Sequence, residues 1–167
     1  MSVGLLAPLT LAALALMSSI TGGPPEPLVR PLVRIVDVRG AAALVARGAA
    51  VLDARDTGAF ASGHIPGAQQ YAWPTMTGTG SARGRIRSDL RAVAQALAHL
   101  GVDGGRPALV YGSSGAGWGE EGHAAWLLAV LGHPDIALLD GGFASWRAAG
   151  RPVVTATSPP RVGRFEP

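Results

Sequence analysis

The chain has 167 residues, of which 48% are hydrophobic and only 15% are charged, a size that fits one globular domain. It contains no cysteine, which excludes disulfides, thiolate metal sites and thiol catalysis by its own residues. All 14 basic residues are arginines and the net charge is only +3. Because these arginines form no stripe with interleaved aromatic residues, we expect no nucleic-acid partner.

The amino-terminal segment differs from the rest of the chain. No charged residue precedes Glu26, and residues 3–20 are 18 uncharged positions that would span about 27 Å as a helix. We therefore expect residues 1–22 to form a hydrophobic helix that anchors the chain in a membrane. The alternative is a signal peptide cleaved near residue 20, which would release a secreted soluble binding domain. The absence of a positive residue before the apolar stretch favours the anchor.

The charges that follow this segment predict its orientation. Arg30, Arg34 and Arg39 follow the apolar stretch and no basic residue precedes it, which favours a cytoplasmic location for the domain. A signal-peptide function would place the domain in the periplasm instead. Residues 23–34 are rich in proline and glycine and are expected to form a stiff spacer between the anchor and the domain.

The first half of the domain alternates strand and helix patterns. Residues 35–36 are expected to form an apolar strand, residues 41–47 a helix ended by Gly48, and residues 51–53 a second strand. Residues 57–61 indicate a brief helical turn and residues 62–67 a turn rich in glycine and proline. A short strand is expected at residues 68–71.

The second half continues the alternation. Leu90, Val93, Leu97 and Leu100 have helical spacing, and we expect Ser88 to cap that helix. A buried strand at 108–111, a glycine-rich loop, a helix at 124–131, a strand at 136–139 and a helix at 143–149 follow. Strands separated by helices predict an α/β domain whose parallel sheet is flanked by helices on both faces.

Four motifs resemble the rhodanese (sulfurtransferase) family. They are V-L-D-A-R-D at 51–56, S-G-H-I-P-G-A at 62–68, A-W-L-L with L-G-H at 125–133, and L-D-G-G-F-A-S-W-R-A-A-G-R-P-V at 139–153. The resemblance covers residues 35–154 and implies a five-stranded parallel sheet. It also implies that Asp53 and Arg55 hold neighbouring loops by charge-assisted hydrogen bonds. We expect structural roles for His64, whose ring would fix its turn, and for Asp140.

The resemblance fails at the catalytic position. In active members, the strand that corresponds to residues 108–111 delivers a cysteine, whereas this chain has Gly112. Persulfide transfer needs a polarizable nucleophile of low pKa, and no other side chain supplies one. The loop is also longer than that of single-domain members and is more similar to the non-catalytic amino-terminal domain of two-domain thiosulfate sulfurtransferases. We therefore expect no catalytic residue in the degenerate loop, whose residues include Gly112, Ser113, Ser114, Gly115, Ala116 and Gly117.

Two other functions of this loop stay open. The pattern Gly112-x-Ser114-x-Ala116 loosely resembles the nucleophile elbow of serine hydrolases, with His123, His133 and Asp140 downstream. The loop could instead capture an anion at the amino terminus of the next helix. Two carboxylates in the first turn of that helix, Glu120 and Glu121, argue against the anion because they already complement the helix dipole.

Candidate partner contacts lie in the loop and in the tail. Trp118 stands in the loop, where a core residue is not expected, whereas Trp73, Trp126 and Trp146 are expected in or near the core. We predict that the tail, residues 155–167, is extended with Phe165 anchored in a pocket. Arg161 and Arg164 would then meet acidic or phosphate groups on this domain or on a partner; the alternative is a disordered end.

Taken together, these patterns predict a non-catalytic rhodanese-like domain that is tethered to a membrane and acts as a binding or structural subunit of a larger membrane protein complex. The alternative is an enzyme that uses the modified loop for non-sulfur chemistry, either hydrolysis or anion turnover. We expect no cofactor. We also expect no metal, because the four histidines lack ligand spacing.

Overall fold

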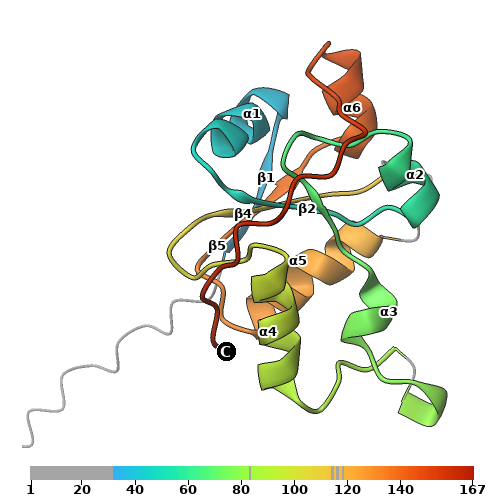
Figure 1. Ribbon diagram of the computed structural model, residues 1–167, viewed down its shortest axis with the longest axis vertical. Coiled ribbons are helices and arrows are strands. Elements are labelled where there is room, and N and C mark those ends of the chain that lie inside the picture. The colour runs from blue at the N-terminus through green and yellow to red at the C-terminus, as the bar shows by residue number, and fades with distance from the viewer. Residues whose placement is uncertain (1–31, 83, 114, 116, 118) are drawn as a thin grey trace, which may run out of the picture.

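A computed structural model describes residues 32–82, 84–113, 115, 117 and 119–167 of the chain. Its centre is a five-stranded sheet in which every neighbouring pair of strands is parallel. The strand order is β1-β5-β4-β2-β3, so β4 lies in the middle (Figure 1). The strands are β1 (Leu32–Val36), β2 (Ala50–Asp53), β3 (Gln69–Gln70), β4 (Ala108–Tyr111) and β5 (Asp135–Leu139).

Helices cover both faces of the sheet, as Figure 1 shows. The helices are α1 (Val38–Ala46), α2 (Thr57–Ala61), α3 (Trp73–Met76), the 3₁₀ turn η1 (Gly80–Ala82), α4 (Leu90–His99), α5 (Glu120–Val130) and α6 (Gly142–Ala148). The core on one face joins side chains of α1, α2 and α6 to the sheet, and the core on the other joins α3, α4 and α5 to it. Every residue of β2 and β4 is buried, because central parallel strands are covered on both sides.

The expected α/β fold with a five-stranded parallel sheet is confirmed, but several element boundaries differ. The cap of α4 is Asp89 and not Ser88, since the Asp89 side chain accepts a 3.0 Å hydrogen bond from the Ala92 N–H. Helix α5 begins at Glu120, four residues earlier than expected, and α3 and η1 were not predicted. Residues 32–34, which we assigned to the spacer, belong to β1.

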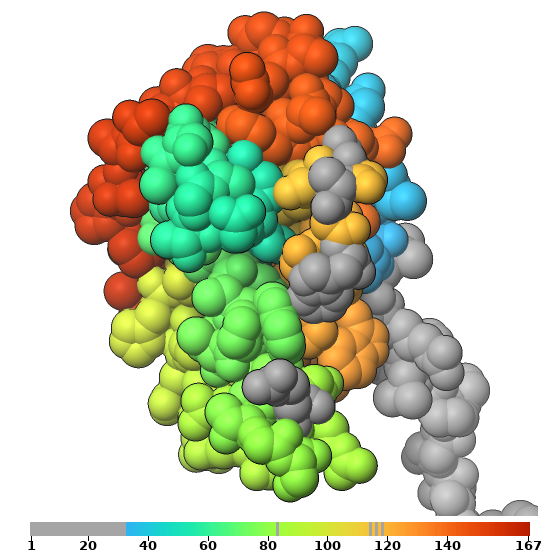
Figure 2. Space-filling view, turned by 90° about the vertical axis from the view of Figure 1, so that its right-hand side faces the viewer, coloured from blue at the N-terminus to red at the C-terminus, as the bar shows by residue number. Residues whose placement is uncertain are grey.

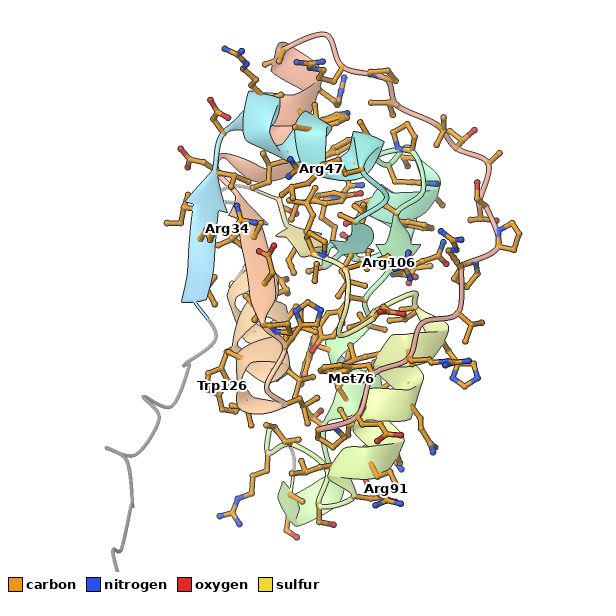
Figure 3. All side chains as sticks on the ribbon, turned by 90° about the vertical axis from the view of Figure 1, so that its left-hand side faces the viewer. Arg34, Arg47, Met76, Arg91, Arg106 and Trp126 are labelled. Carbon is orange, nitrogen blue, oxygen red and sulfur yellow. The ribbon has the colours of Figure 1, made fainter. Side chains whose placement is uncertain are left out.

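The expectation that three tryptophans lie in or near the core is confirmed for Trp146 and Trp73 and wrong for Trp126. Trp146 is buried, and its indole N–H donates to the carbonyl oxygen of Pro152 at 2.8 Å. Trp73 is half-buried. Trp126, by contrast, is 51% exposed and projects away from α5, whereas Met76 points into the interior (Figure 3). The orientation of α5 on the sheet places Trp126 on the outer face of the helix. The apolar sequence of the helix does not indicate which face is buried.

The tail packs on this domain without forming a helix or a strand. Its Phe165 is only 6% exposed and joins the core on the α4 and α5 side, next to the His133 ring. Backbone hydrogen bonds fix this end: the Gly163 N–H donates to Ala98 at 2.9 Å, and Arg164 accepts from the Gly104 N–H at 3.0 Å. Phe165 is therefore anchored on its own domain and is not available to a partner, whereas Arg161 and Arg164 are exposed.

The predicted hydrophobic helix at 1–22 and the spacer up to residue 31 lie outside the described residues. Within the part of the chain that is described, no helix is both long enough and apolar enough to cross a membrane.

Candidate functional site

The candidate site lies at the carboxyl ends of the two central strands, β2 and β4. These strands pair in a register that sets Asp53, the last residue of β2, beside Tyr111, the last residue of β4. The chain then leaves the sheet through residues 54–56 after β2 and through the glycine-rich loop after β4. Ligands of parallel α/β sheets commonly bind at the carboxyl ends of the strands, so the polar groups here are the candidates for function. Figure 2 shows this end of the molecule, with α2, α3 and α6 at its surface.

A buried ion pair closes the end of β2. The carboxylate of Asp53 accepts hydrogen bonds from the Arg55 side chain, at 2.9 Å from Nε and 2.5 Å from Nη2, and from the Arg55 backbone N–H at 3.0 Å. The same Nη2 donates to the carbonyl oxygen of Gly63 at 2.7 Å. The guanidinium carbon lies 3.7 Å from the centre of the Phe143 ring. The pair therefore joins the β2 end to the turn before His64 and to α6.

Tyr111 connects this pair to β4. Its hydroxyl donates to Asp53 Oδ2 at 2.5 Å and accepts from the Ile65 N–H at 3.2 Å. Burial, reinforced by the adjacent Asp53 charge, raises the pKa of Tyr111 above its usual value, so the phenol stays protonated. Burial acts to lower the pKa of Arg55, but the hydrogen bond and charge of Asp53 outweigh it and raise that pKa. The network is thus charged and buried, and its groups are satisfied by hydrogen bonds to one another and to the backbone, as in a structural element.

His64 fixes the turn that follows α2. Its ring stacks on Phe60 with 4.0 Å between centroids, and its Nδ1 lies 3.0 Å from the Phe60 carbonyl oxygen. Its backbone forms both hydrogen bonds of an antiparallel bridge with Val154. The side chain is buried, and its ring contacts hold the turn.

Asp140 acts through its backbone. Its N–H donates to Val36 at 2.9 Å, and its carbonyl oxygen accepts from the Ser145 hydroxyl at 2.7 Å, so it ties β1 to the start of α6. The residue is exposed. Its structural role is therefore independent of the carboxylate.

The position of the missing nucleophile is buried and occupied. Gly112 directly follows β4, and its carbonyl oxygen accepts from the Phe143 N–H at 2.9 Å. A Cβ built on Gly112 would lie 2.6 Å from Cδ of Glu121 and would overlap its Oε2. This carboxylate oxygen is buried, and no hydrogen-bond donor among the described residues reaches it. The side chain of Glu121 therefore fills the space into which a side chain at position 112 would extend.

The rest of the loop is only partly described. Ser113 is half-buried, Gly115 and Gly117 are exposed, and Gly119 has the left-handed conformation that favours glycine at the start of α5, with φ 96°. Three predicted loop residues lie outside the described residues: Ser114, Ala116 and Trp118. Glu120 and Glu121 occupy the first turn of α5, as the sequence predicts.

The two histidines that were candidates for hydrolase chemistry lie in different places. Nδ1 of His123 is 2.8 Å from the Tyr71 hydroxyl, and burial lowers the pKa of this histidine. His133 lies beyond the opposite edge of the sheet, where its Nε2 donates to the carbonyl oxygen of Asp103 at 3.2 Å and its Nδ1 accepts from the Asp135 N–H at 3.3 Å. His133 therefore cannot act on a serine of the loop after β4.

One hollow of about 380 Å³ adjoins the Asp53–Arg55 pair. Its described lining includes the guanidinium of Arg147, which is exposed, and that of Arg55, which is paired with the Asp53 carboxylate, so Arg147 is the group that could meet a small anion. The described residues that line it are Arg55, Ala59, Ser62, Gly63, Phe143, Arg147 and Val153. No group of three or more potential metal ligands occurs among the residues that the structure describes.

Sequence reasoning assigned no role to Tyr111 and did not foresee the contact of Glu121 with Gly112. Tyr111 is a polar residue at the end of an otherwise apolar buried strand, a signal that points to a hydrogen-bond role. Glu121 was expected in the first turn of the helix after the loop, but its contact with Gly112 gives no local signal in the sequence.

Comparisons with known proteins agree with the fold described above. The family model described as "Rhodanese-like domain" matches residues 37–149. The chain is 30% identical over 107 residues to the sulfur carrier protein TtuD of Thermus thermophilus, with 64% of this chain and 36% of that protein covered. It is 32% identical over 116 residues to a thiosulfate sulfurtransferase of Azotobacter vinelandii, with 68% of this chain and 41% of that protein covered.

Among solved structures, the chain resembles SseA from Escherichia coli, in a crystal structure concerned with the rhodanese fold of 3-mercaptopyruvate sulfotransferases. The TM-score is 0.70 at 21% identity, and the match covers 81% of this chain and 55% of SseA. This likeness shows a shared fold. The chain spans about 36–41% of the length of the two curated relatives described above.

Proposed function

The chain belongs to the rhodanese-like domain family, and from this premise we propose that it is a non-catalytic member, tethered to a membrane, that acts as a binding or structural subunit of a larger membrane protein complex. Its curated relatives include a sulfur carrier protein and a thiosulfate sulfurtransferase. The observation that carries the proposal is the pair Gly112 and Glu121: the nucleophile position has no side chain, and a carboxylate fills the space of one.

The absence of cysteine from the sequence supports the same conclusion. Sulfur transfer by this family's chemistry requires a thiolate that accepts sulfur and releases it, and the chain offers neither a thiol nor room for one. The Asp53–Arg55–Tyr111 network is intact by contrast, because the Asp53 carboxylate accepts hydrogen bonds from both Arg55 and Tyr111. A site that keeps its scaffold but lacks its reacting group suits a domain that binds and does not turn over substrate.

The catalytic part of the proposal is tested by measuring thiocyanate formation from thiosulfate and cyanide. We expect the purified full chain to match the uncatalysed rate, with the Azotobacter vinelandii thiosulfate sulfurtransferase as the positive control. Thiocyanate formation above background by the pure chain would overturn the proposal.

The tether is tested by membrane fractionation. We expect the full chain to sediment with membranes and to need detergent for release, because residues 3–20 carry no charge. A variant that lacks residues 2–22 should stay in the supernatant with an unchanged thermal midpoint. Equal partitioning of the two chains would exclude the tether. Membership of a larger membrane protein complex is tested by identifying the proteins that co-purify with the full chain in mild detergent.

A second candidate function is anion binding at the hollow beside Arg55 and Arg147, a site distinct from the loop of the anion-turnover alternative, since none of the described loop residues lines it. Titration calorimetry with sulfate and thiosulfate measures this directly. If an anion binds there, Arg147→Ala should abolish the heat of binding. An enzyme that uses the loop hydroxyls should also lose activity in Ser113→Ala and Ser114→Ala, whereas a binding module should keep its partner in both variants.

A further inference from the structure

The side chain of Glu121 turns back from α5 toward the end of β4. A Cβ added to Gly112 would lie 2.6 Å from Cδ and 3.1 Å from Cβ of this glutamate, in addition to overlapping its Oε2. Distances between unbonded carbon atoms in packed proteins are about 3.5–4.0 Å. The overlap therefore involves most of the Glu121 side chain and not its tip alone.

The two glutamates at the start of α5 differ in where they point. Oε2 of Glu121 is buried without a donor among the described residues. The Glu120 carboxylate lies instead over Gly117, an exposed loop residue. Both charges can complement the amino-terminal end of the helix dipole. Only Glu121 occupies the position of the family nucleophile, so Glu120 provides a matched control of equal charge in the same helical turn.

We propose that the Glu121 carboxylate is an internal plug of the former nucleophile position, and that Gly112 and Glu121 form a matched pair. Gly112 leaves the room that the plug needs, and the plug excludes small sulfur oxyanions such as thiosulfate by occupying the space and by repelling their charge. This inference deepens the proposed function at the same loop, since it assigns the closure of the site to a second residue.

The chemistry of sulfur transfer explains why both positions must change to reopen the site. In the family's reaction, a cysteine thiolate attacks the outer sulfur of thiosulfate. The new sulfur–sulfur bond gives a cysteine persulfide, and the sulfur–sulfur bond of thiosulfate breaks so that sulfite leaves with the electron pair. A carboxylate in contact with the thiol would raise the pKa of the thiol and repel the incoming dianion. Restoring a cysteine at position 112 alone would therefore leave the plug in place.

The test compares the full chain with Glu121→Ala, Gly112→Cys, the double variant Gly112→Cys with Glu121→Ala, and the control pair Gly112→Cys with Glu120→Ala. Because the chain has no cysteine of its own, the introduced thiol is the only one present. The thermal midpoint of each variant is measured first. Separate native samples are then incubated with thiosulfate, and persulfide formation is followed by intact mass.

We expect Gly112→Cys to lower the thermal midpoint by about 3–8 °C, because overpacking a filled site is destabilising. In the Glu121→Ala background the same substitution should lower the midpoint by less than about 2 °C. Persulfide should form at least about tenfold faster in the double variant than in Gly112→Cys or in the Glu120 control, a difference of about 1.4 kcal/mol in barrier.

The proposal is overturned if Gly112→Cys lowers the midpoint equally with and without Glu121, or if the double variant reacts no faster than the Glu120 control. Should Gly112→Cys fail to fold, the same melting comparison with Gly112→Ala tests the plug, since alanine adds only the overlapping Cβ. Failure of the proposed function is distinguishable, because it would appear as thiocyanate formation by the unmodified chain.

Discussion

Two carboxylates lie at the carboxyl ends of the central strands, and they are held in opposite ways. The carboxylate of Asp53, after β2, accepts hydrogen bonds from Arg55 and Tyr111 and is fully buried. The Glu121 carboxylate, beyond β4, has a buried oxygen that no described donor reaches. The difference distinguishes two parts of the site. Around Asp53, the groups that stabilise the fold have their hydrogen-bond partners, whereas Gly112, beside Glu121, has no side chain at the position of the family nucleophile.

The contrast predicts that buried groups with hydrogen-bond partners contribute most to the stability of the fold. Substitution of Asp53 should therefore have the largest effect. Asp53→Ala leaves the buried Arg55 guanidinium and the Tyr111 hydroxyl without their acceptor. We expect a loss of about 3–5 kcal/mol in the free energy of unfolding, measured by urea denaturation. Glu121→Ala should cost less than about 1 kcal/mol, because it removes a carboxylate that lacks a hydrogen bond. Equal losses in the two variants would erase the contrast.

The tail offers the same comparison between two apolar residues. Phe165 is 6% exposed, whereas Val162, three residues earlier, is 64% exposed. Phe165→Ala should destabilise the chain by about 3 kcal/mol in the same urea measurement, because it leaves a cavity between α4 and α5. Val162→Ala is the control, with an expected change within about 0.5 kcal/mol. A Phe165→Ala loss below about 1 kcal/mol would show that the tail does not stabilise the domain.

The histidines extend the comparison to pH. Burial lowers the pKa of His133 in the folded state below its unfolded value, so the neutral form is favoured by folding. This contribution to stability is fully present above the unfolded pKa of about 6.5 and is lost as the pH falls below that value and through the lower folded pKa. We expect the thermal midpoint to drop between pH 7 and pH 5, and His133→Gln to reduce the drop.

Two comparisons check the assignment to His133. The exposed His99 is the control, so His99→Gln should leave the pH dependence unchanged. Burial lowers the pKa of His123 as well, so part of the drop should persist in His133→Gln. An unchanged pH dependence in His133→Gln would contradict the prediction.

The smallest expected effect concerns the start of α4. Asp89 caps the helix by accepting from the Ala92 N–H, whereas the exposed Ser88, which the sequence analysis favoured, is not the cap. Asp89→Ala should cost about 1 kcal/mol of unfolding free energy and Ser88→Ala less than about 0.5 kcal/mol. A larger loss of unfolding free energy in Ser88→Ala than in Asp89→Ala would identify Ser88 as the cap.

The sequence by itself determined the α/β class and the family resemblance, because strand and helix periodicities and turn motifs are local. It also determined the absence of a thiol nucleophile, since Gly112 and the lack of cysteine are read directly from the sequence. The start of α4 was placed one residue early because Ser88 and Asp89 are both good caps, and only the backbone path selects between them. The same local patterns missed α3, which is only four residues long.

Only the tertiary structure decided the contacts between segments that are distant in sequence. The strand order places Tyr111 against Asp53, 58 residues apart, and the fold brings the tail's Phe165 beside His133. The exposure of Trp126 depends on the orientation of α5 on the sheet. The Glu121 carboxylate reaches the space above Gly112 because the loop returns α5 to the end of β4. Such contacts depend on how whole helices and strands pack together, and local sequence patterns do not specify that packing.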